Sequence, residues 1–225
     1  MSARLDPPKE IPENMREIWA HIGGETCDIR TKLIFHKQLY SSEKWHIDKL
    51  NKAGGFLFYI IDNLFMDDLT LSLARLTDPA KTKGKENLSL LRLIDEVESN
   101  DFKNKMMAQY QKIKSLVEAA QDHRNKRIAH NDLNVLTQNY PKLLPNLTLN
   151  CLHSILASIE EFLNEFQLHY SSVPFDFTML QVPEDVDNLM IRICKSEAYD
   201  ALVKEGKTPF QYWEKFYGEP AQVNP

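Results

Sequence analysis

The sequence predicts an all-α fold: a helical bundle with an additional N-terminal helical segment and a C-terminal tail. Apolar residues recur at steps of three and four over several long stretches, which is the spacing of one face of an α-helix. Glycine is scarce, with 7 among 225 residues, below an average usage of roughly 7%. A chain of this length can bury a substantial core in one large domain.

Two helices are expected before residue 41. Pro12 can open the first, because proline is tolerated in the first helical turn. Gly23-Gly24 is expected to break or bend this helix. A second helix is then expected from about Glu25 to Tyr40.

The next expected helix is the most apolar in the chain. It begins near Glu43 and is ended by Asp78-Pro79, because the residue before a proline disfavours helical backbone. Its part from Phe56 to Leu76 is apolar on nearly all sides. Such a helix belongs in the centre of a bundle or between two subunits.

A polar, basic loop over residues 80–87 separates this helix from a short one that ends near Val97 and is capped by Asn87 or Ser89. The following helix is long, from Phe102 to about His130. Its apolar positions form one stripe: Met106, Tyr110, Ile113, Val117 and Ala120.

The rest of the chain is expected to hold a loop over residues 133–146, a bundle helix over 147–170, a linker over 173–187 and a last helix over 186–203. An aromatic tail follows from Gly206. We therefore predict a bundle over residues 1–170 and a C-terminal extension over residues 171–225 that packs on it.

Composition narrows the classes of function. A formal net charge of -5 and an isoelectric point near 5.8 argue against a protein that coats nucleic acid through bulk charge, so such a role needs a local basic cleft. Three distant cysteines exclude a disulfide scaffold and fit a reducing cytoplasm. Neither a signal peptide nor a membrane-spanning stretch is expected, and no zinc spacing or glycine-rich phosphate loop is present.

One stretch, from Asp122 to Asp132, concentrates proton-transfer and phosphate-binding groups. It holds three cationic side chains and two imidazoles: Arg124, Lys126, Arg127, His123 and His130. The buried stripe of the long helix, continued by the same steps, reaches Arg124 and then Arg127 or Ile128. In an ideal helix Arg124, Arg127 and His130 follow one side of the axis.

An arginine followed four to six residues later by a histidine is a weak pattern alone, since it also occurs at Arg16 with His21 and at Arg30 with His36. The context of the third match is more specific. Here Arg124-Asn125, four further residues and His130 stand at the end of a bundle helix. This arrangement resembles the signature of the HEPN family of nucleotide-binding domains.

A second segment supports the same resemblance. The run Leu73-Ala74-Arg75-Leu76-Thr77-Asp78-Pro79-Ala80, followed by Asn87-Leu88-Ser89-Leu90, is similar to the abortive-infection (AbiU-type) branch of that family. The resemblance covers roughly residues 45–170.

The resemblance implies a HEPN-like bundle that forms a homodimer, with two such motifs facing one shared cleft. It also implies metal-independent RNA cleavage without a cofactor, in a toxin or a phage-defence effector with an antitoxin or another protein partner. His130 would be the general base or acid, Arg124 the phosphate clamp, and Asn125 the residue that orients His130 or the phosphate. Arg127, Lys126 and Asp132 would bind or support.

The chemistry of the residues agrees with this hypothesis. Cutting RNA without a metal needs a base for the 2′-hydroxyl and a cation for the negative charge that builds on the phosphorane. Histidine titrates near neutrality, and an arginine fork meets two phosphate oxygens at once.

Two other interpretations stay open. The same motif in an inactive domain would only bind nucleotide, RNA or a protein partner. Alternatively, basic residues near a helix C-terminus form a cap that offsets the helix dipole, each contributing roughly 0.3–1 kcal/mol, within a purely structural dimer.

The remaining charged positions are expected to be structural. Arg75 lies in a mostly apolar helix and needs a partner if buried, for which Asp78 is the candidate. His36 and His46 are expected on solvated faces, and Glu160 on the surface.

Overall fold

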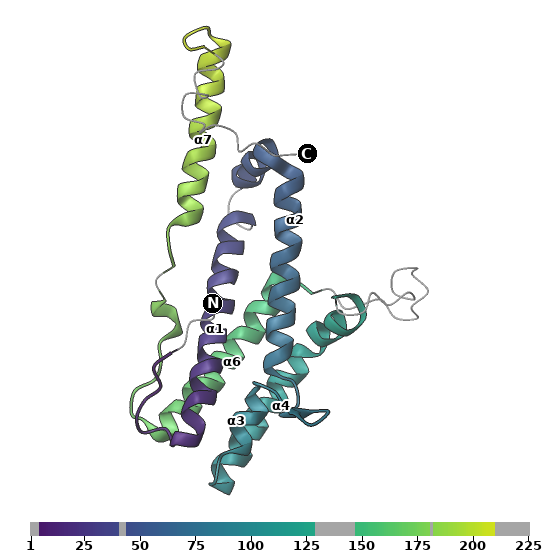
Figure 1. The fold of residues 1–225 in the computed structure, drawn as a ribbon, viewed down its shortest axis with the longest axis vertical. Helices are drawn as coiled ribbons and strands as arrows, with labels where there is room; N and C mark the ends of the chain where they lie inside the picture. The colour runs from purple at the N-terminus through teal and green to yellow at the C-terminus, as the bar shows by residue number, and fades with distance from the viewer. Residues whose placement is uncertain (1–4, 41–43, 129–146, 181, 210–225) are drawn as a thin grey trace, which may run out of the picture. The chain divides into compact units, whose positions relative to one another are not determined.

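The computed structural model describes residues 5–40, 44–128, 147–180 and 182–209, with only the backbone for 127, 128 and 179. Its elements in chain order are α1 Glu13–Tyr40, α2 Lys44–Leu76, β1 Lys81–Thr82, β2 Lys85–Glu86, α3 Leu90–Asp95, α4 Asn100–His123, η1 Arg124–Ile128, α6 Leu149–Tyr170, η2 Phe177–Met179 and α7 Asp185–Lys204 (Figure 1). Among the described residues, β1 and β2 are the only strands. The all-α prediction is confirmed.

The chain divides into two compact units. The first comprises Met1–Lys37 and Tyr59–Val182, and the second comprises Gln38–Phe58 and Pro183–Pro225. The division therefore falls inside α1 and α2. The bundle over residues 1–170 with a C-terminal extension stays a prediction.

Within the first unit, α1 and α2 run antiparallel. Three pairs of side chains join them: Glu25 with Arg75 (3.1 Å), Lys32 with Asp68 (2.6 Å) and His36 with Asp62 (2.7 Å). The α2 partner moves back along the sequence as the α1 partner moves forward, which is the order of an antiparallel pair.

The ion pair between Arg30 and Glu160 joins α6 to α1. Nε of Arg30 donates to Oε1 of Glu160 at 2.6 Å, and Nη2 donates to Oε2. The hydrogen bond to the carboxylate raises the pKa of Arg30 above its usual value. The expectation of a surface Glu160 is wrong, because the residue is only 7% exposed; a buried carboxylate needs a partner, and α1 supplies it.

The predicted stripe of α4 forms part of the core. Met106, Tyr110, Ile113, Val117 and Ala120 are all buried, as the sequence indicated. They belong to one apolar cluster that also contains residues of α1, α2, α3 and α6. At the start of α4 the Phe102 ring stacks on His169 of α6, with 3.6 Å between ring centroids.

Helix starts follow the capping rules. The side-chain oxygens of Ser89, Ser99 and Thr148 accept hydrogen bonds from backbone N–H groups at the starts of α3, α4 and α6. Each such cap contributes about 1 kcal/mol. Of the two caps expected for α3, the structure selects Ser89.

The predicted break at Gly23-Gly24 is wrong, because α1 continues unbroken from Glu13 to Tyr40. A Cβ atom on Gly23 would lie 2.7 Å from Cδ1 of Leu5. Gly23 therefore gives the N-terminal segment room to pack on the helix. The bend instead occurs in α2, at Gly54, whose backbone is not helical (φ 170°, ψ 59°).

The basic loop after α2 forms a small antiparallel hairpin of β1 and β2. Its turn residues Lys83 and Gly84 both have positive φ, 49° and 80°, as a type I′ turn requires. The side-chain amide of Asn87 fastens the hairpin by donating to the carbonyl of Pro79 at 2.7 Å and to Oγ1 of Thr82 at 2.8 Å.

The expectation of solvated histidines is wrong for His36. Its side chain is buried, with Nε2 2.7 Å from Oδ1 of Asp62 and the ring edge-on to Phe65. His46 is half-buried, and its Nδ1 lies 2.9 Å from the carbonyl oxygen of Gln38.

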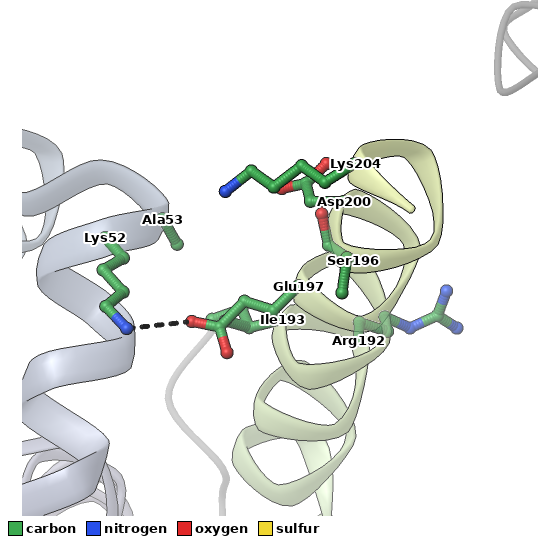
Figure 2. Close-up of a pocket in the computed structure, with 9 residues that line it drawn as sticks. Lys52, Ala53, Arg192, Ile193, Ser196, Glu197, Asp200 and Lys204 are labelled. Carbon is green, nitrogen blue, oxygen red and sulfur yellow. Dashed lines mark ion pairs between the residues drawn. The ribbon is translucent and has the colours of Figure 1, made fainter. Parts of the chain in front are cut away.

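The second unit packs the first part of α2 against α7. Glu197 of α7 pairs with Lys49. It also pairs with Lys52 at 3.9 Å, which is the ion pair drawn in Figure 2. The hydrogen bond between Lys49 and Glu197 raises the pKa of the lysine and lowers that of the carboxylate. A cavity of about 670 Å³ lies beside these ion pairs, between Lys52 and Lys204.

The described part of the chain lacks two features. None of its helices has the length and apolar character needed to cross a bilayer. Nor do its histidine, cysteine and acidic side chains form a group of three or more that could hold a metal ion.

Candidate functional site

The candidate site begins where the buried stripe of α4 ends. Ala120 is the last fully buried member of the stripe, and Arg124 follows one turn later. The Arg124 side chain is only 20% exposed. A charged guanidinium so placed requires an acidic or hydrogen-bonding partner.

At Arg124 the helix also changes its winding. α4 passes into one turn of π-helix, Arg124–Ile128, while the backbone N–H of Arg124 is shared between the carbonyls of Ala120 and Gln121. π-helical turns are rare and often occur at functional sites. A π-helical turn contains more residues than an α-helical turn. The positions of Arg124 and Arg127 around the helix axis therefore differ from the α-helical positions that the sequence predicted.

Asp78 is the partner of Arg124. Nη1 of Arg124 donates to Oδ1 of Asp78 at 2.6 Å, and Nε donates to Oδ1 of Asn125 at 3.0 Å. These two hydrogen bonds fix the orientation of the guanidinium. The carboxylate is 26% exposed, so the pair lies at the edge of the core, partly open to solvent.

Two hydrogen bonds from α4, one of them buried, hold the segment that carries Asp78. The hydroxyl of Tyr110 donates to the carbonyl of Thr77 at 2.9 Å, and the amide of Gln121 donates to Oγ1 of Thr77 at 3.1 Å. Burial, with a smaller effect from the negative charge of Asp78, raises the pKa of Tyr110. Thr77, directly after α2, is thus tied to α4 through both its backbone carbonyl and its side-chain hydroxyl.

A pocket of about 290 Å³ lies beside this pair, lined by Glu25, Arg75, Leu76, Asp78, Asn87 and Leu88. The sequence paired Arg75 with Asp78, and the structure corrects this. Nη2 of Arg75 donates to Oε1 of Glu25 at 3.1 Å and to Oγ of Ser72 at 3.0 Å. Asp78 faces α4 instead, because the two ends of the helices meet there.

The pocket is therefore lined by one guanidinium, Arg75, and by two carboxylates, Glu25 and Asp78. The second guanidinium, Arg124, pairs with Asp78 and is not among the lining residues. Arg75 is 60% exposed and Arg124 only 20%. An incoming phosphate would meet the exposed cation first and would compete with Asp78 for the second. The arrangement suits anion binding that is weak until the carboxylates are displaced or outnumbered.

The other predicted site residues fall into three groups, according to how much of each the structure describes. Asn125 is exposed, and Lys126 pairs with Asp122 one turn earlier at 3.1 Å. Arg127 lies in the π turn with only its backbone described. His130 and Asp132 lie outside the described residues.

Sequence reasoning missed Asp78 and Glu25 as neighbours of the site. Asp78 was recognisable as the residue that ends an apolar helix before a proline. The residues around it, however, do not indicate that it pairs with a residue at the end of α4. The cavity of Figure 2 is lined by residues of the second unit and contains none of the predicted site residues.

The chain matches a known protein family. The family model HEPN_AbiU2, described as AbiU2, matches residues 9–189. The match extends beyond the region of residues 45–170 over which the motifs indicate the resemblance, and it includes α1. No curated protein matches, and no solved structure matches. Because the match covers most of the sequence and the fold is all-α, the chain belongs to the AbiU2 family of HEPN domains.

Proposed function

We propose that the protein is a metal-independent endoribonuclease that uses the end of α4 to bind and cut RNA. One observation carries this proposal: a mostly buried guanidinium, Arg124, stands in a π-helical turn where the core stripe ends, beside a pocket with a second guanidinium, Arg75. Burial strengthens the interaction of such a cation with phosphate, because less water screens the charge.

In this proposal His130 moves the protons. A histidine can take the proton of the 2′-hydroxyl and return one to the leaving 5′-oxygen, because its pKa is near neutrality. Such catalysis is worth about 100- to 10,000-fold. Arg124 stabilises the charge on the phosphate, Asn125 holds the Nε side of Arg124, and Arg127, Lys126 and Asp132 support RNA binding.

We further propose that the active form is a homodimer. Several large apolar side chains of α2 are exposed in the single chain: Phe56 77%, Leu57 58%, Tyr59 62%, Ile60 39% and Leu64 61%. Exposed apolar surface of this kind marks interaction sites. The later turns of α2 bury Leu69, Leu73 and Leu76 inside the unit. In this proposal the exposed apolar side chains of its earlier turns bind a second copy of the chain.

Membership of the AbiU2 family supports a role as a toxin or abortive-infection effector, with an antitoxin or other protein as a further partner. One observation favours the alternative of an inactive binding module. Asp78 occupies the face of Arg124 that a phosphate would use, so the site is charge-balanced before substrate arrives.

The direct experiment is incubation of a mixed RNA pool with the purified full chain in excess chelator. Endoribonuclease activity predicts cleavage that is lost in both His130→Ala and Arg124→Ala. The control is Arg92→Ala, which removes a guanidinium of α3 that pairs with Glu86 and Glu96.

The outcomes separate the alternatives. RNA left intact by the wild type but bound in a manner that weakens with salt and with Arg124→Ala supports the inactive module. Intact RNA with no binding removes both proposals and leaves a structural helix cap.

A further inference from the structure

The pocket beside Asp78 has the size of a nucleobase. Its volume of about 290 Å³ corresponds to roughly ten water molecules at about 30 Å³ each. A purine base has about as many non-hydrogen atoms as that. The pocket can therefore hold one base of a single-stranded nucleic acid, and it is too small for a paired helix.

The charged side chains of this pocket are already paired. Glu25 pairs with Arg75 at 3.1 Å, and Asp78 pairs with Arg124 at 2.6 Å. Each carboxylate thus has a guanidinium beside it, and the two pairs together carry no net charge. The best ligand is therefore a neutral group with hydrogen-bond donors, because a cation would gain little from charges that are already balanced.

The pair of Glu25 with Arg75 leaves hydrogen-bonding groups for a ligand. Nη2 of Arg75 donates to Oε1 of Glu25 and to Oγ of Ser72. Among the described residues, neither Nη1 of Arg75 nor Oε2 of Glu25 has a hydrogen-bond partner. Oε1 can also accept a second hydrogen bond, since a carboxylate has about four acceptor sites on its two oxygens. The pair therefore presents one donor N–H group next to two acceptor oxygens.

These groups are complementary to the Watson–Crick edge of guanine. That edge carries the acceptor O6 followed by the donors N1–H and N2–H. It can accept from Arg75 and donate to both carboxylate oxygens of Glu25. Adenine and cytosine have only one donor group on this edge, and uracil would place a carbonyl oxygen against the carboxylate. Proteins commonly recognise single-stranded RNA bases through this edge.

The remaining lining residues suit the faces and the rim of a base. Leu76 is buried at the end of α2, and Leu88 is 43% exposed after the hairpin. Both provide apolar surface for a planar ring. The side-chain amide of Asn87 donates to Pro79 and to Thr82, so its carbonyl oxygen is a further acceptor. Apolar walls with a few placed polar groups are typical of small-ligand sites.

We propose that this pocket binds a guanine base of single-stranded RNA, and that Glu25 and Arg75 recognise its Watson–Crick edge. The inference rests on the proposed function in one respect, namely that the base belongs to RNA held at Arg124. Asp78 joins the two places, since it lines the pocket and accepts the hydrogen bond from Arg124. A phosphate next to the bound guanosine therefore lies near Arg124, and RNA is cut beside guanosine.

Binding of uncleavable RNA tests the proposal without depending on catalysis. Oligonucleotides with 2′-O-methyl groups lack the attacking hydroxyl. The probes are labelled oligouridines with one central guanine, adenine, cytosine or inosine, and fluorescence anisotropy measures their binding to the full chain. We expect guanine to bind at least about tenfold more tightly than adenine, cytosine or uridine alone, because it makes one more hydrogen bond to a charged group.

Inosine gives a test that needs no variant of the protein. It differs from guanosine only in lacking the N2 amine, so it loses one hydrogen bond to Glu25 and should bind about tenfold more weakly than guanine. Equal affinity for the two probes would overturn the proposal. So would a folded wild type that binds none of the probes.

A substitution assigns the preference to the pocket. Glu25→Gln replaces one acceptor oxygen with a donor amide and should abolish the preference for guanine. The matched control is Glu165→Gln, because Glu165 is 29% exposed and pairs with Lys105, whereas Glu25 is 23% exposed and pairs with Arg75. This control should keep the preference. A preference that survives in Glu25→Gln, shown to be folded by circular dichroism, would overturn the assignment.

The apolar wall gives a different expected result. Leu88→Ser removes a contact that any base would make, so it should weaken all four probes by similar factors and keep the preference for guanine. Leu88 is exposed, which makes the change mild for the fold. Selective loss of guanine binding in Leu88→Ser would contradict recognition by Glu25 and Arg75.

Mapping of cut sites separates this inference from the proposed function. A wild type that cuts RNA equally beside all four bases would overturn the guanine pocket and leave the endoribonuclease. Guanine-selective binding without any cleavage would support the pocket and remove the endoribonuclease.

Discussion

Nη1 of Arg124 donates a 2.6 Å hydrogen bond to Oδ1 of Asp78, joining the end of α4 to the residue that follows α2 by two positions. Both side chains are about one quarter exposed or less, at 20% and 26%. The carboxylate therefore holds the guanidinium in place and also competes with any phosphate that approaches it. Substitutions of Asp78 separate these two effects.

We predict that Asp78→Asn binds RNA more tightly than the wild type. The substitution removes one negative charge beside Arg124, and two unit charges about 4 Å apart interact by about 1 kcal/mol in water, so a gain of roughly fivefold is expected. Filter binding at fixed salt measures it. Cleavage per bound RNA should fall, because the guanidinium loses its fixed position.

The matched control for this change is Asp68→Asn, which removes the same charge from α2 at the ion pair with Lys32. It should bind RNA like the wild type. Equal tightening in both variants would mean that overall charge, and not the contact with Arg124, sets the affinity.

A stability prediction concerns the pair of Arg30 with Glu160. Arg30→Met leaves a buried carboxylate without its cation, and we expect a loss of roughly 3–5 kcal/mol in the free energy of unfolding. Lys32→Met breaks a more exposed pair with Asp68, with side chains 37% and 49% exposed, and should cost less than about 1 kcal/mol. Urea denaturation measures both; similar losses would contradict a structural role specific to Glu160.

The stability of the fold should also depend on His153. Burial, aided by the positive charges of Lys37 and Arg30, lowers the pKa of His153 below 6.5. The unfolded chain therefore binds this proton more readily, so stability is lost as the pH falls from about 6.5 through the lower pKa of the folded state.

Thermal melts between pH 7.5 and 5 compare His153→Gln with His21→Gln, which changes an exposed histidine of α1. The first variant should lose part of the decline in melting temperature on acidification, and the second should keep it. An identical decline in the wild type and His153→Gln would exclude His153 as its source.

Association is predicted to depend on the exposed apolar part of α2. Leu64→Glu places a charge on that surface and should convert a dimer into monomers, as sedimentation velocity would show. Leu116→Glu makes the same change at a 46% exposed leucine of α4 and serves as the control. A wild type that sediments as a monomer, or a Leu64→Glu protein that stays dimeric, would contradict the proposed interface.

Periodicity predicted the parts of the fold that depend on local geometry. The α4 stripe from Met106 to Ala120 is buried as expected, since one face of a helix repeats every three or four residues. Gly23 was misinterpreted because its role depends on Leu5, which packs against it from outside the helix.

The partners of charged residues could not be predicted in the same way. Arg75 and Asp78 are close in sequence, yet they pair with Glu25 of α1 and with Arg124 of η1. Those pairings depend on which helices pack against each other in the folded chain. The π turn at Arg124 was equally hidden, because its residue types are ordinary for the end of an α-helix.

The central claim is that the site at the end of α4 cuts RNA through the RNA's own 2′-hydroxyl. Attack by that hydroxyl leaves a 2′,3′-cyclic phosphate on one product and a 5′-hydroxyl on the other. We therefore predict these ends when a defined RNA is cleaved by the wild-type protein in excess chelator and its products are analysed by mass spectrometry. Products with 3′-hydroxyl and 5′-phosphate ends, or cleavage that persists in His130→Ala, would contradict the account.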